Sequence, residues 1–277
     1  MFRNLLETLR KILGKPPATA GDPASGPQDG ADMPVGSEEI PVHSGSPAET
    51  APGVIPVIDQ PHIPGYLWCL DNGHGKATPG KRSPVFQNGN TLYEYELVRD
   101  INRRIMASLD AKGLKYFNVV PETEGDISLS DRVSRANNKA SNLPKIYLSI
   151  HSNAFGKPGE WTSASGIETW YYESSGAGKK IASAFQRCLI QSTSWFDRGI
   201  RFHQPKAKAF FVLRNTSMPA VLTENGFYTN MTESGLLSGE EFRKKIADAH
   251  VNAILEIEKS GFQGLIVYPK NIGIKLL

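Results

Sequence analysis

Cysteine is scarce in this chain, whose 277 residues include only Cys69 and Cys188. Small secreted domains held together by disulfides need several cysteine pairs, so the sequence argues against a disulfide framework. Cys69 lies in the apolar run YLWCL and Cys188 lies in a segment with helical periodicity. Both are therefore expected to be small buried core residues, although the sequence alone leaves a pairing between them open.

The first segment, residues 1–15, lacks the length and the uninterrupted apolar stretch of a membrane-spanning helix. It also lacks the apolar core and small-residue cleavage site of a secretory signal peptide. Its apolar residues recur at helical spacing with positive residues between them, which predicts an amphipathic helix. We expect this helix to contact a protein partner or its own domain; contact with a membrane surface and an unusual targeting role are the alternatives.

Residues 16–65 have few apolar side chains and are rich in proline, glycine, serine and alanine. Such a segment cannot bury enough apolar area to offset the entropy cost of ordering it, so we predict a disordered linker. Charge separates the N-terminal part of the chain from the remainder. Residues 1–66 carry four Lys or Arg and eight Asp or Glu, a formal charge of −4, and the chain total of +3 leaves +7 on residues 67–277.

A basic domain indicates an anionic partner such as nucleic acid, a membrane surface or a cell-wall polymer. The chain shows no zinc-knuckle spacing, no helix-turn-helix signal and no stretch that interleaves aromatic and basic residues, so we expect no nucleic-acid partner. No internal repeat is evident either.

Strand-like and helix-like segments alternate from residue 66 onward, which predicts an α/β fold with a sheet covered by helices on both faces. Strands are expected at residues 66–70, 115–120, 145–151, 166–172, 209–215 and 219–225, and helices at 94–113, 129–142, 178–191 and 238–261. In an open α/β sheet, ligands bind beyond the carboxyl ends of the strands.

Three ionisable residues follow apolar runs at such strand ends: His74, His151 and Glu224. Glu94 opens the first long helix, and the preceding loop can bring its carboxylate over the sheet. Two neutral imidazoles and one carboxylate suit Zn²⁺ with a position left open for water. The metal would lower the pKa of that water to roughly 7, and Glu224 would be the free carboxylate that moves its proton.

Seven blocks in this order resemble the zinc-dependent N-acetylmuramoyl-L-alanine amidases over residues 67–259: LDNGHG, LYEYELVRDINRRI, ISLSDRVSRAN, IYLSIHSNA, GIETWYY, FFVLRNTSMPAVLTENGFYTN and FRKKIADAHVNAI. The resemblance implies a twisted mixed sheet of about six strands flanked by helices, in a catalytic domain over residues 66–261. It implies cleavage of the amide between N-acetylmuramic acid and L-alanine in peptidoglycan. The alternatives are a zinc hydrolase of another amide or peptide, and a cell-wall-binding module that keeps the fold without catalysis.

Carried over by position, the resemblance makes His74, Glu94 and His151 the Zn²⁺ ligands and Glu224 the catalytic glutamate. Glu96 competes with Glu94 for the third ligand position, and the match favours Glu94. Asn153 is expected to contact the substrate peptide.

The sequence departs from the family at Asn72, where the family usually has proline. Asparagine also adopts turn geometry, so this change leaves the ligands intact. Asp71 could orient a ligand histidine from behind, and Arg132 matches a recurrent position that we interpret as structural.

Some members of the family carry a helical insertion that blocks the zinc site until a partner protein removes it. The loops after the second histidine are too short for such a helix, so no activator protein is expected. Residues 262–277 lie beyond the resemblance and could add a strand, seal the domain or bind a partner. The resemblance implies action on the cell wall, in the periplasm or at the extracellular face. Because no cleavable signal peptide is visible, we expect either a phage-type lysin made in the cytoplasm or a host enzyme exported or anchored by its N-terminal helix.

Overall fold

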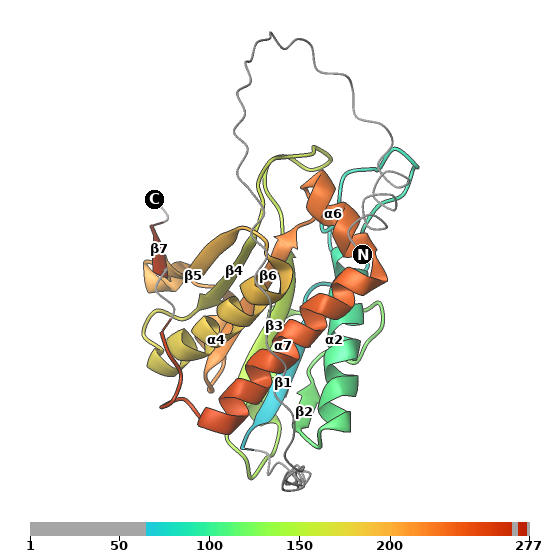
Figure 1. Cartoon of the computed structure of the whole chain (residues 1–277). Helices are drawn as coiled ribbons and strands as arrows, with labels where there is room; N and C mark the ends of the chain where they lie inside the picture. The colour runs from blue at the N-terminus through green and yellow to red at the C-terminus, as the bar shows by residue number, and fades with distance from the viewer. Residues whose placement is uncertain (1–64, 268–270, 276–277) are drawn as a thin grey trace, which may run out of the picture. The chain divides into compact units, whose positions relative to one another are not determined.

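A seven-stranded mixed sheet forms the centre of the computed structural model, which describes residues 65–267 and 271–275 (Figure 1). The strands are β1 (Leu67–Asn72), β2 (Lys115–Asn118), β3 (Lys145–Asn153), β4 (Ile167–Tyr171), β5 (Asp197–Gln204), β6 (Ala220–Phe227) and β7 (Asn271–Lys275). Their order is β2-β1-β3-β6-β4-β5-β7, and neighbours are parallel except β4 and β6, which are antiparallel. The predicted mixed α/β sheet is confirmed, whereas the predictions for residues 1–15 and for the linker up to residue 64 lie outside the described residues.

Helices cover both faces of this sheet. They are α2 (Glu94–Ala111), α3 (Leu129–Asn138), α4 (Gly176–Thr193), α5 (Phe211–Asn215), α6 (Met231–Ser238) and α7 (Glu240–Ser260), with a short 3-10 turn at Lys206–Lys208. Helices α2, α7 and α4 lie side by side over the face that Figure 1 presents, and α3 and α5 pack on the opposite face. No helix within the described ranges is long and apolar enough to cross a membrane.

Alternation along the buried strands divides the core into two layers. On β1, Trp68 and Leu70 pack against α2, α4 and α7, whereas Cys69 points to the layer that contains α3 and α5. Cys188 on α4 belongs to the first layer, so the two cysteines lie on opposite sides of the sheet and are free. Their burial was predicted, whereas the sequence had left a pairing between them open. The face that carries Cys69 and Tyr147 also carries the polar residues at the ends of β1 and β3.

The helices end where the sequence provides stop signals. Gly113 follows α2 with φ 68° and Gly261 follows α7 with φ 58°, a region of backbone conformation that favours glycine. At its start, α3 is capped by Ser128, whose hydroxyl accepts a hydrogen bond from the Asp131 amide at 3.1 Å. These ends agree with the predicted helices to within a few residues.

One predicted strand is wrong. Residues 209–215, expected to be extended, form the short helix α5, because a short apolar run fits a buried helix as well as a strand. The sequence pattern also did not predict β5, where the positive φ of Gly199 (80°) accompanies an irregular register against β4. The C-terminal tail adds a strand, one of the three roles considered for it, and β7 is the seventh strand of the sheet.

Candidate active site

The carboxyl ends of β1, β3 and β6 meet at one edge of the sheet because these three strands are parallel. Asn72 at the end of β1 is opposite Ile150 on β3, and His151 on β3 is opposite Glu224 on β6. Strand register therefore places His151 beside Glu224, with the turn that follows β1 next to them.

The turn after β1 brings His74 back over the end of β3. Its φ is 60°, a left-handed conformation that is uncommon outside glycine. A side chain at Gly73 would put a Cβ atom 2.3 Å from Cε1 of His151, so only glycine allows the turn to approach this imidazole. The ring centroids of His74 and His151 lie 4.8 Å apart.

Two buried or half-buried arginines hold the turn. The His74 carbonyl oxygen accepts hydrogen bonds from Arg99 Nη1 at 3.0 Å and from Arg132 Nη2 at 3.2 Å. Arg132 is itself paired with Asp71 (2.6 Å), and the second oxygen of Asp71 accepts a bond from Ser149 Oγ at 2.7 Å. Asp71 thus orients the His74 turn through Arg132, and not by a direct bond to an imidazole.

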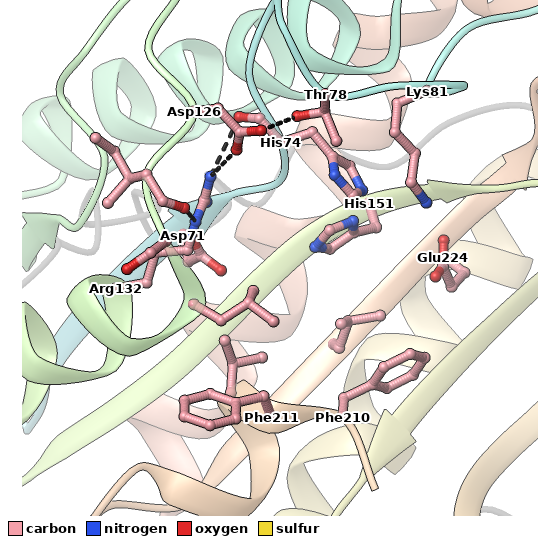
Figure 2. Close-up of a pocket in the computed structure, with 15 residues that line it drawn as sticks. Asp71, His74, Thr78, Lys81, Asp126, Arg132, His151, Phe210, Phe211 and Glu224 are labelled. Carbon is pink, nitrogen blue, oxygen red and sulfur yellow. Dashed lines mark hydrogen bonds and ion pairs between the residues drawn. The ribbon is translucent and has the colours of Figure 1, made fainter. Parts of the chain in front are cut away.

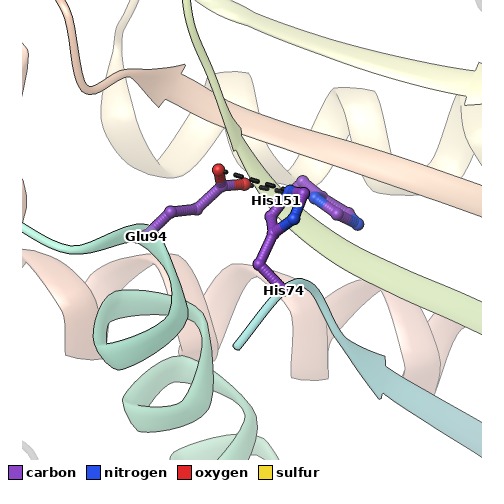
Figure 3. Close-up of side chains that lie close together, drawn as sticks. All are labelled: His74, Glu94 and His151. Carbon is purple, nitrogen blue, oxygen red and sulfur yellow. Dashed lines mark hydrogen bonds and ion pairs between the residues drawn. The ribbon is translucent and has the colours of Figure 1, made fainter. Parts of the chain in front are cut away.

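Glu94 reaches the two histidines from the first turn of α2. Its Oε1 lies 3.1 Å from Nδ1 of His151, and its Oε2 lies 3.4 Å from Nε2 of His74 (Figure 3). Glu94 is 1% exposed, whereas Glu96 is exposed and accepts a hydrogen bond from the Tyr95 hydroxyl. The geometry therefore groups Glu94, not Glu96, with His74 and His151.

These three side chains fit a divalent metal. Their ligand atoms all lie within 4.8 Å of one another, and Oε2 of Glu94 is buried without a hydrogen-bond donor among the described residues. Burial lowers the pKa of His74 to about 4, which keeps the imidazole neutral as a ligand must be. Burial raises the pKa of Glu94, but the hydrogen bond to His151 and the electrostatic effect of the two neighbouring histidines outweigh it and leave the pKa below its usual value.

Glu224 stands beside this cluster and takes no part in it. Its Oε2 is buried and has no hydrogen-bond partner within the described part of the chain. Burial raises its pKa well above the usual range, and the neighbouring carboxylates of Glu94 and Glu168 raise it further. A carboxyl group in such surroundings can accept a proton and hold it. A general base that later acts as a general acid needs this property.

Comparison with known proteins identifies the family. Residues 69–256 match the family described as N-acetylmuramoyl-L-alanine amidase (Amidase_3). The chain belongs to this amidase family.

Two relatives each match about 70% of the amidase chain. It is 33% identical to the endolysin of Bacillus phage SPP1 over 70% of this chain and 68% of the phage protein. It is 30% identical to the sporulation-specific N-acetylmuramoyl-L-alanine amidase of Bacillus subtilis (strain 168), over 74% of this chain and 73% of that one. The crystal structure of N-acetylmuramoyl-L-alanine amidase from Clostridium difficile 630 superposes with a TM-score of 0.61 at 31% identity, covering 72% of this chain and all of that one.

A cleft of about 510 Å³ opens beside the candidate metal-ligand cluster of the amidase, which consists of His74, Glu94 and His151 (Figure 2). Figure 2 shows His74, His151 and Glu224 on one side of it, with Lys81 extending toward Glu224. Its apolar wall consists of Ile127, Leu129, Phe210, Phe211, Val212 and Leu222. The sequence pattern did not single out Lys81 or Phe210, although Phe210 opens one of the blocks that resemble the family.

Asn153, expected to contact substrate, does not line this cleft. Its amide nitrogen donates to Oε1 of Glu168 at 3.0 Å, and its own oxygen accepts from the Ala154 amide at 2.8 Å. Glu168 in turn pairs with Arg198 (2.6 Å) and Arg201 (2.9 Å), and it is 4% exposed. This buried network was not predicted, and its signal in the sequence is the glutamate inside the apolar strand GIETWYY.

Proposed function

We propose that this amidase is a Zn²⁺ enzyme that hydrolyses the amide bond between N-acetylmuramic acid and the first L-alanine of the peptidoglycan stem peptide. One observation carries the metal assignment: three ligand atoms from His74, Glu94 and His151 lie within 4.8 Å, and Oε2 of Glu94 is buried without a donor among the described residues. Two imidazoles and one carboxylate are a ligand set that Zn²⁺ accepts. When bound, Zn²⁺ would supply a Lewis acid that acidifies water and polarises the amide carbonyl.

Glu224 is the proposed general base. Strand register places it next to His151, and its buried Oε2 can take a proton from water. The water oxygen then forms a bond to the carbonyl carbon, and the electron pair of the C=O π bond moves to the carbonyl oxygen. When this pair returns, the C–N bond breaks and Glu224 gives its proton to the departing nitrogen. The products are the carboxylic acid of the lactyl group and the free amino group of L-alanine.

The proposed site of action is the cell wall. The similarity to the endolysin of Bacillus phage SPP1 supports a role in cell-wall lysis, and the similarity to the sporulation-specific enzyme supports a role in the bacterium's own wall. In both cases peptidoglycan is the partner of this amidase. Asn153 remains a proposed contact for the stem peptide, which would have to displace it from Glu168.

The decisive experiment is digestion of purified sacculi followed by mass spectrometry. The expected products are glycan strands whose N-acetylmuramic acid residues carry a free lactyl carboxylate, together with intact stem peptides that begin with a free L-alanine amino group. Cleavage within the peptide would instead indicate a zinc hydrolase of another amide, and no cleavage by the zinc-loaded protein would indicate a binding module.

Matched variants separate the metal site from the base. Glu94→Gln should lose bound zinc, whereas Glu96→Gln, two residues away and exposed, should keep both zinc and activity. Glu224→Gln should keep zinc and lose at least about 10²-fold in kcat, the usual contribution of a positioned proton-transfer group. Undiminished cleavage by Glu224→Gln would contradict the assignment of the base.

A further inference from the structure

Lys81 lines the cleft, and among the described residues its side chain forms no ion pair with a carboxylate. The cleft also contains the guanidinium of Arg132, but that group is paired with Asp71 at 2.6 Å. Within residues 65–267 and 271–275, no hydrogen bond or ion pair involves the Lys81 ammonium. Figure 2 shows the side chain extending into the cleft toward Glu224, beside the two imidazoles.

The backbone at Lys81 is tied to the helix that carries Glu94. The Lys81 carbonyl oxygen accepts a hydrogen bond from the Glu94 amide at 3.0 Å. The next residue, Arg82, forms an antiparallel bridge with Tyr93, and the Ser83 amide donates to the Leu92 carbonyl at 2.8 Å. The base of the Lys81 side chain therefore keeps a fixed position relative to the metal-ligand cluster.

The charge of Lys81 acts on the reacting groups. The Lys81 side chain lines the same cleft as Glu224, His74 and His151, so its charge lies close to the groups around the reacting amide. A lysine ammonium offers three donor hydrogens and no acceptor, so it suits an oxygen that gains negative charge. Amide hydrolysis creates such an oxygen when the C=O electron pair moves onto the carbonyl oxygen.

We propose that Lys81 is a further catalytic residue, whose ammonium binds the carbonyl oxygen of the scissile amide and stabilises the negative charge that forms there. This inference rests on the proposed amidase function. Lys81 donates a hydrogen bond and keeps its proton throughout, while Glu224 takes the proton of the attacking water and returns it to the departing nitrogen. Lys81 thus acts on the carbonyl oxygen, whereas Glu224 acts on the attacking water and on the departing nitrogen.

The test compares Lys81→Met with Lys76→Met in the full chain, using a soluble N-acetylmuramic acid–pentapeptide as substrate. Lys76 lies in the same loop, between β1 and α2, but its side chain is 60% exposed and pairs with Glu124 outside the cleft. Loss of a donor to a developing oxyanion costs about 10²–10³-fold in kcat. We expect this loss for Lys81→Met with KM nearly unchanged, partial recovery in Lys81→Arg, and no loss for Lys76→Met.

Three further readings accompany the rates: zinc per chain, melting temperature and the pH profile of kcat. Zinc per chain and melting temperature are expected to match those of the wild type, and the lost kcat should not be restored at any pH. An unchanged kcat in Lys81→Met would overturn the inference, as would an effect confined to KM. A loss that is regained at another pH would also overturn it, because Lys81 would then act by tuning Glu224. Failure of the zinc-loaded wild type to cleave the substrate would refute the proposed function instead.

Discussion

Asp71→Asn tests the buried ion pair behind the active-site turn. Asp71 and Arg132 are 1% and 2% exposed and lie 2.6 Å apart, so the substitution leaves a buried guanidinium without its counter-charge. Breaking such a pair by removing one partner costs about 3–5 kcal/mol in the free energy of unfolding. For a domain of this size, each kcal/mol corresponds to about 2–4 °C, so the melting temperature should fall by about 6–20 °C.

The assay is urea unfolding followed by circular dichroism, with Asp126→Asn as the matched control. Asp126 also faces Arg132, but at 3.9 Å and with a side chain 39% exposed, so its loss should cost no more than about 1 kcal/mol. In a double-mutant cycle, Asp71→Asn should be much less damaging when Arg132 is already methionine. Equal destabilisation by Asp71→Asn and Asp126→Asn, or strict additivity in the cycle, would refute the reasoning.

The geometry supports three other predictions. Gly73→Ala should reduce zinc content and activity because the new Cβ atom would lie 2.3 Å from the His151 ring. Gly176→Ala is the control and should change neither, since a Cβ atom there meets open space. Equal zinc content in the two variants would contradict this prediction. Burial lowers the pKa of His250 to about 4, so the unfolded chain binds its proton first as the pH falls, and stability present above about pH 6.5 should decline by about 3 kcal/mol toward pH 4. A His250→Gln variant with the same decline would exclude this residue as the cause. The full chain should digest sacculi without an added protein, since the described loop between β3 and β4 contains no helix; zinc-loaded protein that stays inert until a second protein is added would contradict this.

The sequence predicted site residues best where a single strand or helix determines the position of the side chain. His74, His151 and Glu224 were predicted from their places at strand ends, and parallel register brings the last two opposite each other. Glu94 opens its helix as predicted, and its burial separates it from Glu96.

The sequence pattern did not predict features that depend on contacts between separate loops and strands. The Lys81 side chain reaches the cleft only because its loop is tied to the start of α2, and no local periodicity encodes that contact. The network around Glu168 joins three strands, β3, β4 and β5, and β5 itself was not predicted. Residues 209–215 were assigned as a strand because the five-residue apolar run at 209–213 is too short for its periodicity to distinguish strand from helix.

The pairing of β7 with β5 covers an edge of the sheet that would otherwise be open. Five register pairs, from Ile200↔Asn271 to Gln204↔Lys275, use the open hydrogen-bonding side of β5. Without them β5 would be an eight-residue edge strand, able to recruit a strand from another molecule. With β7 in place, the sheet is bounded by two short strands, β2 with four residues and β7 with five, and short edges are poor templates for aggregation. Truncating the chain after α7 would keep the metal-ligand cluster and uncover a surface prone to self-association.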